Sequence, residues 1–485
     1  MSKYYSLQQR SGLATVALIS LLALFSIAIS YAISAYGYNT GLVIISGIVG
    51  LALVVTCFAK PTLGFYLCIT FGFIISVFER ILYGIITFDF VVEILTYVTL
   101  FGQVYKKHLQ RESFWKGMRH PINYFMLAYL AFLLIECFNP NAASLMGSLF
   151  SLRKTAQIVV LYLTALSIFQ SYKAIRQFFY FWIIISGLCG LYACYQQWIG
   201  FPKFEMNWIK SSEIRVAIYQ LDNGSFRKFS TLTDPAAFGI LMAVSALLTI
   251  VTILKAPANR TKVLYAAALL FQLLGMSYSG TRTAIFTLIA GLGLYILMTL
   301  NNAKTMLFAV FCTLVFGFLM FAPIYGNITI NRFRSAFHFT KDASYNVRNN
   351  NRAHIQPYIY AHPIGGGPMT TGTNGLKYNP SHYLAGFPTD SGFLKSALEF
   401  GWVGLALVCL LFFVTLQQGA HQYFKEQSPL ARAFLLAAVV ALFGNIVSQY
   451  SQIAIGATPE IYLYYVLVAI IITISKLENK EKINV

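Results

Sequence analysis

Long apolar runs, broken by short polar clusters, recur along most of the chain. Runs such as Leu13 to Ala35, Ile122 to Phe138 and Ala284 to Leu300 are each close to the roughly 17 to 25 residues that cross a bilayer as a helix. A membrane barrel would instead show about 10-residue segments of alternating polarity, and these runs do not alternate. The pattern therefore predicts membrane-spanning helices.

Dividing the apolar runs at polar clusters gives candidate spans at 13–36, 41–59, 62–78, 85–104, 121–138, 155–170, 178–199, 233–254, 263–280, 283–300, 305–323, 393–417, 431–449 and 458–475. Charged residues interrupt the third and fourth of these runs. We therefore expect an all-α polytopic membrane protein with 12 to 14 transmembrane helices. We read the first apolar stretch as a retained helix, because it is too long for the core of a signal peptide.

The composition supports this interpretation. Of 485 residues, 58% are hydrophobic and 11% are charged, whereas a soluble globular domain usually carries about 25% charged residues. The formal net charge is +19, but no basic run interleaved with aromatic residues lies in a soluble stretch, so we expect no nucleic-acid partner.

The positions of lysine and arginine in the short loops predict the orientation, because cytoplasmic loops carry an excess of both. With the N-terminus inside, the cytoplasmic side receives Lys106, Lys107, Arg111, Lys116, Arg119, Lys173, Arg176, Lys255, Arg260, Lys262, Lys476, Lys480 and Lys482. The cations left on the outer side are Arg80, Arg153, Lys154, Lys203, Lys210, Arg215, Arg227, Lys228, Arg282, Arg332, Arg334, Lys341, Arg348, Arg352, Lys377 and Lys395.

Two outward segments hold most of these outer cations. We divide the chain into N-terminal helices (1–199), a first outer loop (200–232), helices with a short outer hairpin near 281 (233–323), a large outer loop (324–392) and C-terminal helices with a cytoplasmic tail (393–485). Loops of such length are usually functional or disordered, and we expect an ordered extracytoplasmic cap.

Positive charge on the outer side suggests an anionic ligand. The planar fork of arginine matches phosphate oxygens bidentately and stays charged, so a diphosphate is the natural candidate. Alternatively, individual cations contact lipid headgroups or pair with acids such as Glu205, Glu213 and Asp222.

Two short motifs precede the large loop. The first runs from Arg227 to Pro235 and leads into a span; Thr233 or Asp234 would cap that helix, since proline favours the first turn. The second is the tight hairpin from Ser277 to Arg282, which pins Arg282 at the membrane face. A snorkelling anchor is the alternative role for Arg282.

The large loop contributes two further motifs. Arg348 and Arg352 are four residues apart, so a helix would direct both to one side as a pincer for a diphosphate. The sequence His362-Pro363-Ile364-Gly365-Gly366-Gly367 indicates a turn with close backbone approach. Thr389-Asp390-Ser391 then leads into a span that contains Glu399 and Gly401.

In this order, the four motifs resemble the signature of the O-antigen ligase and polymerase superfamily, over roughly Arg227 to Gly404. The resemblance implies a GT-C-like fold with a large periplasmic loop. It also implies a metal-independent, inverting glycosyltransferase without a cofactor, which takes a glycan from undecaprenyl diphosphate at the periplasmic face of the bacterial inner membrane and passes it to an acceptor hydroxyl.

By the same resemblance, Arg227 and one or both of Arg348 and Arg352 would grip the donor diphosphate. Together with Arg282, these arginines would surround one diphosphate-binding site. Lipopolysaccharide ligases carry a histidine where this sequence has Asp390, whereas members that polymerise exopolysaccharide or capsule look similar in carrying an acidic residue. We therefore expect Asp390 to act as general base, with His382 as the alternative base and a helix cap as the alternative role of Asp390.

The leading hypothesis is a polymerase of lipid-linked repeat units of O-antigen, capsule or exopolysaccharide. The alternatives are an O-antigen ligase acting on lipid A-core, a protein O-oligosaccharyltransferase, a flippase or transporter, and a structural subunit. Transport is disfavoured because charge within the predicted spans is sparse. The expected partners are the undecaprenyl-diphosphate-linked donor, a glycan, lipid A-core or protein acceptor, membrane lipids and a candidate chain-length regulator.

Overall fold

The computed structural model describes residues 33–82, 89–115, 119–142, 144–221, 224–255, 260–324, 326, 328–335, 337, 343–456 and 458–483, together with residues 20, 23–24, 26–27 and 29–31. The predicted span 13–36 lies largely outside the described residues. Lys116, Asp222 and Lys341, named above, lie outside them as well.

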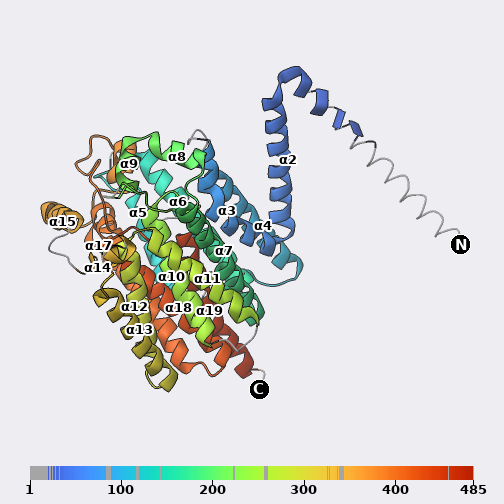
Figure 1. Cartoon of the computed structure of the whole chain (residues 1–485). Coiled ribbons are helices and arrows are strands. Elements are labelled where there is room, and N and C mark those ends of the chain that lie inside the picture. The colour runs from blue at the N-terminus through green and yellow to red at the C-terminus, as the bar shows by residue number, and fades with distance from the viewer. Residues whose placement is uncertain are drawn as a thin grey trace.

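Helices make up most of the described chain (Figure 1). In order they are α2 (Tyr38–Ala59), α3 (Pro61–Ile81), α4 (Asp89–Leu109), α5 (Pro121–Glu136), α6 (Leu145–Ile168), α7 (Tyr172–Trp198), α8 (Lys203–Lys210), α9 (Glu213–Tyr219), α10 (Pro235–Lys255), α11 (Arg260–Tyr278), α12 (Arg282–Met298), α13 (Ala303–Phe321), α14 (Ile328–Ser335), α15 (Ala343–Ala361), α16 (Gly372–Tyr378), α17 (Gly392–Lys425), α18 (Pro429–Ser448) and α19 (Glu460–Ile483).

Within the described residues, 8 helices are long and apolar enough to cross a membrane: α3, α6, α7, α10, α13, α17, α18 and α19. Shorter apolar helices are Val43–Ala59 within α2, together with α5 and α12. Every predicted span from 41–59 to 458–475 coincides with a helix. The prediction of an all-helical, multi-pass membrane protein is confirmed.

The sixth predicted span begins earlier than the apolar pattern indicated. α6 starts at Leu145, where the Ser144 side chain accepts a hydrogen bond from the Gly147 backbone N–H at 3.2 Å. Arg153 and Lys154, expected in an outer loop, therefore lie within α6. The Arg153 Nε is 3.1 Å from the Glu93 Oε2 of α4, so the charges that broke the apolar run form a contact between helices.

The centre of the bundle is built from α10, α18 and α19. These three helices contribute most of the fully buried aliphatic side chains, including Leu241, Leu248, Leu436 and Leu467. A helix that is apolar on all sides belongs in the middle of a bundle. α13, in contrast, lies at the edge with most of its apolar surface exposed (Figure 1). The buried helices form a fixed frame for the segments that connect them.

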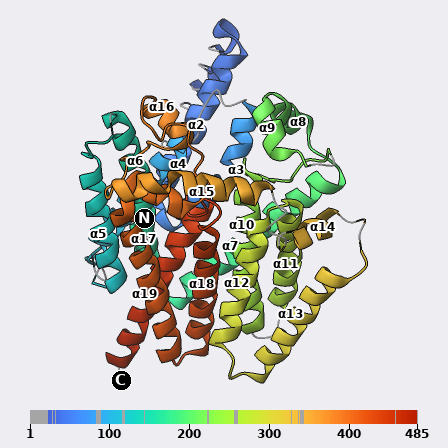
Figure 2. The same cartoon turned by 90° about the vertical axis from the view of Figure 1, so that its left-hand side faces the viewer.

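The two predicted outer loops contain helices of their own. α8 and α9 lie between α7 and α10, and α14, α15 and α16 lie between α13 and α17. α15 runs crosswise over the helices of the bundle and packs against α17 (Figure 2). Arg348 and Arg352 both lie on α15, which is the condition under which the sequence directs the two side chains to one side.

Arg80 of α3, predicted among the outer cations, is fully buried. Its guanidinium donates to the backbone carbonyls of Ser230, at 3.1 Å, and Leu232, at 2.7 Å, and lies 3.3 Å from the Glu205 carboxylate of α8. Burial raises the pKa of Glu205 although Arg80 opposes the shift. A buried ion pair of this kind contributes little net stability, but it fixes the segment that enters α10.

Candidate functional site

Asp390 stands immediately before α17, and its neighbour Ser391 caps that helix. The Ser391 Oγ accepts a hydrogen bond from the Leu394 backbone N–H at 3.3 Å and donates to the Gln449 carbonyl at 2.8 Å. The Asp390 carboxylate instead faces Arg348, with 3.9 Å between Oδ2 and Nε. The capping role that the sequence offered to Asp390 thus falls to Ser391, and the carboxylate is available for other chemistry.

Arg348 and Arg352 lie one turn apart on α15 but have different surroundings. Arg352 donates from Nη2 to the Tyr450 carbonyl at 2.7 Å, and its guanidinium lies 4.4 Å from the centre of the Tyr450 ring. Arg348 faces Asp390 and is about one-third exposed. Arg352 therefore anchors α15 to the segment between α18 and α19, whereas Arg348 remains accessible beside the carboxylate.

Asp390 and Asp234 line one cavity of about 250 Å³. The other lining residues are Ser76, Leu232, Thr233, Ala237, Ile240, Thr389, Gln452, Ile453, Ala454 and Thr458. The Asp234 carboxylate accepts hydrogen bonds from the backbone N–H groups of Ala236, at 2.9 Å, and Ala237, at 3.1 Å. Asp234, one of the two residues named for that role, thus caps α10. Of the two carboxylates that line the cavity, Asp390 is the one that caps no helix.

The segment from 449 to 454 joins the elements around this cavity. The Gln449 carbonyl accepts from the Gly392 backbone N–H at 2.9 Å, and its side-chain Oε1 accepts from the Ala454 backbone N–H at 2.9 Å. The Ser451 hydroxyl lies 2.8 Å from the Thr283 hydroxyl of α12. The starts of α12 and α17 are therefore tied to one short connection.

Arg227 joins the first motif to the second. Its Nε donates to the Ser279 carbonyl and its Nη2 to the Thr281 hydroxyl, each at 2.9 Å. Gly280 turns the hairpin with φ +61°, a conformation that favours glycine. Burial, followed by the nearby charge of Arg332, lowers the pKa of Arg227 to about 10. The structure thus brings together two motifs that are separate in the sequence.

Arg227 belongs to a cluster of three arginines, which we call the arginine cluster: Arg227, Arg282 and Arg332. Arg282 opens α12, and its charge also acts on Arg227. The Cζ of Arg332 lies 3.5 Å from the point where a Cβ on Gly280 would stand. Like charges gathered in this way favour binding of an anion. Asp234, at the edge of the cavity, lies within electrostatic range of Arg227.

Sequence reasoning missed Arg332 and Glu460 as members of this region. Arg332 stood among the outer cations, but no motif singled it out. Glu460 opens α19, two residues beyond Thr458 of the cavity; it is 1% exposed, and its carboxyl oxygens have no hydrogen-bond partner within the described part of the chain. The one sequence signal for Glu460 is its position shortly after the polar segment near residue 450.

The glycine turn of the third motif packs against a break in α17. Gly366 and Gly367 donate from their backbone N–H groups to the carbonyls of Leu398 and Glu399, each at 2.8 Å. Gly401, with φ +64°, leaves no room for a side chain, because a Cβ there would lie 1.9 Å from the Pro363 carbonyl oxygen. The predicted close backbone approach is confirmed.

His382 lies against this glycine turn and does not line the cavity. Its Nδ1 accepts a hydrogen bond from the Leu384 backbone N–H at 3.1 Å, and its Cε1 would lie 2.7 Å from a Cβ on Gly366. Burial and the neighbouring His362 lower the pKa of His382. Its contacts are those of a packing residue near the turn.

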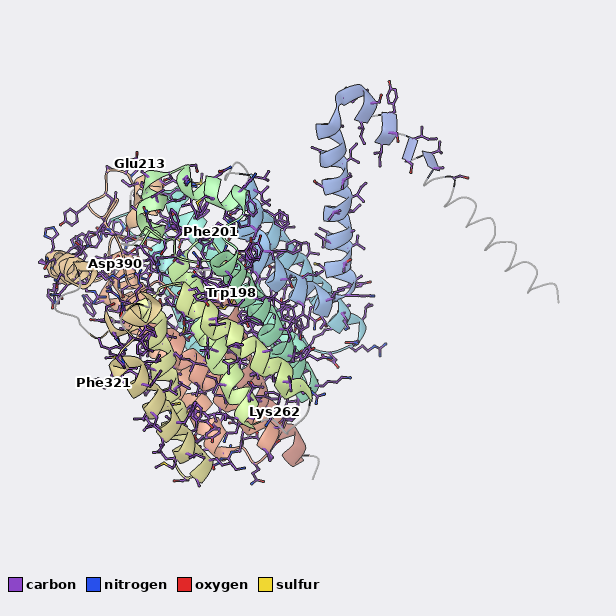
Figure 3. All side chains as sticks on the ribbon, in the orientation of Figure 1. Trp198, Phe201, Glu213, Lys262, Phe321 and Asp390 are labelled. Carbon is purple, nitrogen blue, oxygen red and sulfur yellow. The ribbon has the colours of Figure 1, made fainter. Side chains whose placement is uncertain are left out.

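The cavity and the arginine cluster lie at one end of the bundle. Figure 3 shows Asp390 at the same end as Glu213 of α9, with Lys262 of α11 at the opposite end. A carboxylate close to a cavity can accept a proton from a hydroxyl. Guanidinium groups can bind phosphate oxygens and stabilise negative charge on a leaving group.

Comparison with known proteins assigns this part of the chain to a family. Residues 266–409 match the model of the family described as O-antigen ligase. The matched segment includes the hairpin, α15 and the start of α17, but it does not reach Arg227. A comparison with curated proteins found no match. Residues 266–409 therefore match a domain of the O-antigen ligase and polymerase family, whose enzymes transfer lipid-linked glycans.

Proposed function

We propose that the protein is a metal-independent, inverting glycosyltransferase that polymerises undecaprenyl-diphosphate-linked repeat units of a surface polysaccharide. The reaction takes place in the cavity beside Asp390, at the periplasmic face of the bacterial inner membrane. The observation that carries the proposal is that Ser391 caps α17, which leaves the Asp390 carboxylate facing the cavity and Arg348.

In the proposed step, the acceptor hydroxyl attacks the first carbon of the donor glycan from the face opposite the diphosphate. A glycosidic bond forms, the bond from that carbon to the phosphate oxygen breaks, and undecaprenyl diphosphate leaves. Asp390 takes the hydroxyl proton. Arg227, Arg282, Arg332 and Arg348 bind the diphosphate and stabilise its growing charge, while Arg352 holds α15 in place.

An acidic residue at the start of α17 favours polymerisation over ligation. The resemblance associates a histidine at this position with ligases and an acid with polymerases, and this chain has Asp390 there. Transfer of a finished glycan to lipid A-core or to a protein hydroxyl uses the same chemistry and is the alternative. A chain-length regulator would be a further partner only of a polymerase.

The test supplies the purified protein with lipid-linked repeat units alone. We expect a ladder of longer lipid-linked products. Absence of product until lipid A-core or an acceptor protein is added would show a ligase instead. Movement of the intact lipid-linked unit across the membrane of a proteoliposome, without new glycosidic bonds, would show a flippase and contradict both proposals.

A further inference from the structure

A second cavity, of about 380 Å³, lies at the end of the bundle opposite Asp390. We call it the far-end pocket. It is formed where α10 ends, α12 turns into α13, and α17 turns into α18. Its lining residues are Lys255, Met298, Thr299, Asn301, Asn302, Tyr423, Phe424, Pro429, Arg432 and Ala433.

The far-end pocket contains two cations and no acidic lining residue. Lys255 Nζ lies 5.9 Å from the centre of the Tyr295 ring, and Arg432 Cζ lies 5.1 Å from the centre of the Tyr423 ring. These cation–π contacts position both charges but do not neutralise them. Among the described residues, neither cation has a carboxylate within 4.0 Å. Two unneutralised cations around one cavity favour an anionic ligand.

The acid closest to the pocket in sequence does not serve as the counterion. Glu426 follows α17 directly, but it is buried, and its Oε1 accepts a hydrogen bond from the Ser428 backbone N–H at 2.9 Å. The remaining polar lining comes from Thr299, Asn301 and Asn302. Hydroxyl and amide groups can donate hydrogen bonds to phosphate oxygens.

Exposed apolar side chains lie next to the lining residues of the far-end pocket in the chain, where the apolar part of a ligand can pack. They come from the last turn of α10, the end of α12 and the connection between α17 and α18: Leu254, Leu297, Leu300, Phe424 and Leu430. A soluble phosphate compound would make no use of such a surface, whereas the acyl chains of a phospholipid would cover it.

We propose that the far-end pocket binds an anionic phospholipid, with its headgroup phosphate between Lys255 and Arg432 and its acyl chains along the surrounding apolar surface. Basic pockets between membrane helices are a common form of lipid recognition. α10 and α17 both run from the cavity of Asp390 to this pocket. A bound lipid therefore fixes the far ends of the two helices that Asp234 and Ser391 cap. The proposal does not depend on the enzymatic function.

Native mass spectrometry of the full chain, stripped of lipid in neutral detergent, tests the proposal. The probes are phosphatidylglycerol, phosphatidylcholine with the same acyl chains, and glycerol phosphate, which lacks acyl chains. We expect phosphatidylglycerol to bind at least about tenfold more tightly than phosphatidylcholine. The double variant Lys255→Gln, Arg432→Gln should lose that preference. Lys262→Gln, which removes a charge at the same end but outside the lining, should retain it.

Equal binding of phosphatidylglycerol to the wild type and the double variant would overturn the proposal. Displacement of the lipid by an equal concentration of glycerol phosphate would also overturn it, because the ligand would then be a soluble phosphate compound. If the double variant does not fold, the single variants Arg432→Gln and Arg432→Lys replace it. Phosphatidylglycerol should then raise the Tm of Arg432→Lys but not that of Arg432→Gln, and an equal rise in both would contradict the proposal.

Discussion

The Nε of Arg348 lies 3.9 Å from the Oδ2 of Asp390, while Ser391, the residue after Asp390, caps α17. This relationship separates two functions that are often combined in one side chain. Ser391 satisfies the helix end, and Asp390 points to a guanidinium and a cavity. A cation that binds the leaving diphosphate would thus stand next to the group that accepts the proton.

Replacing Asp390 by Asn should lower kcat by at least about 100-fold, because a positioned base contributes that much or more. Donor affinity should not fall, since the arginine cluster is unchanged and Arg348 loses the carboxylate that competes with the diphosphate for its charge. Turnover of lipid-linked repeat units and donor binding would be measured on the same protein.

The matched control is Asp234→Asn in the same cavity. Asparagine caps helices as well as aspartate does, so activity should persist if Asp234 serves only α10. If Asp234→Asn were the inactive variant and Asp390→Asn the active one, the roles of the two carboxylates would be the reverse of those proposed.

Arg332→Gln should weaken donor binding as strongly as Arg282→Gln, although only Arg282 belongs to a sequence motif. Loss of one charge-assisted hydrogen bond to phosphate corresponds to a roughly 10- to 100-fold rise in the donor KM. Arg215→Gln is the control, because Arg215 stacks on Trp208, 4.5 Å from the ring centre, at the same end of the molecule. A rise in KM as large in Arg215→Gln would indicate a general charge effect rather than a site.

Gly401→Ala should abolish activity without removing any functional group. The new Cβ would overlap the Pro363 carbonyl, and the backbone at φ +64° disfavours alanine, together about 2–4 kcal/mol of destabilisation. Thermal unfolding and turnover would both be recorded. Gly317→Ala in α13 is the control, because a Cβ there meets nothing within 4 Å. An active, stable Gly401→Ala protein would contradict the packing described here.

Lys228→Met should make the stability of the protein less dependent on pH between about 8 and 10.5. Burial lowers the pKa of Lys228 to about 8, so the unfolded chain binds the proton more tightly than the folded one. The resulting destabilisation is complete below pH 8 and is relieved as the pH rises from about 8 toward 10.5. The Tm of the wild type should therefore rise relative to that of Lys228→Met over this range. A constant difference in Tm across the range would show that Lys228 does not titrate as described.

The helical bundle could be predicted from the sequence because each span is a long apolar run, and that signal is local. Helix ends were less predictable where charges lie inside a helix. Arg153 interrupts the apolar run of α6, so the sequence placed it in a loop. In the structure it pairs with Glu93 of α4, a partner that the local sequence pattern does not indicate. Arg80 was expected to be exposed on the outer side of the membrane, but it is buried. Its partners Glu205 and Ser230 are far from it in sequence, so the local pattern gives no sign of them.

The candidate site was predictable where a motif carried it and not elsewhere. The pairing of Arg227 with the hairpin of Gly280 depends on contacts between segments about 50 residues apart, so the motifs could be named but not joined. The choice between Asp390 and Ser391 as helix cap rests on side-chain geometry, which sequence preference alone leaves open because both residues are good caps. Arg332 approaches Gly280 only through the folded chain.

The central claim is that the protein forms a glycosidic bond by inverting displacement of undecaprenyl diphosphate. It is tested most directly by NMR of the product made by the purified protein from lipid-linked repeat units labelled with carbon-13 at the first sugar carbon. We predict that the new linkage has the opposite anomeric configuration to the donor, and that one undecaprenyl diphosphate is released for each bond formed. A product with the donor's configuration, or longer glycan without release of the diphosphate, would contradict the account.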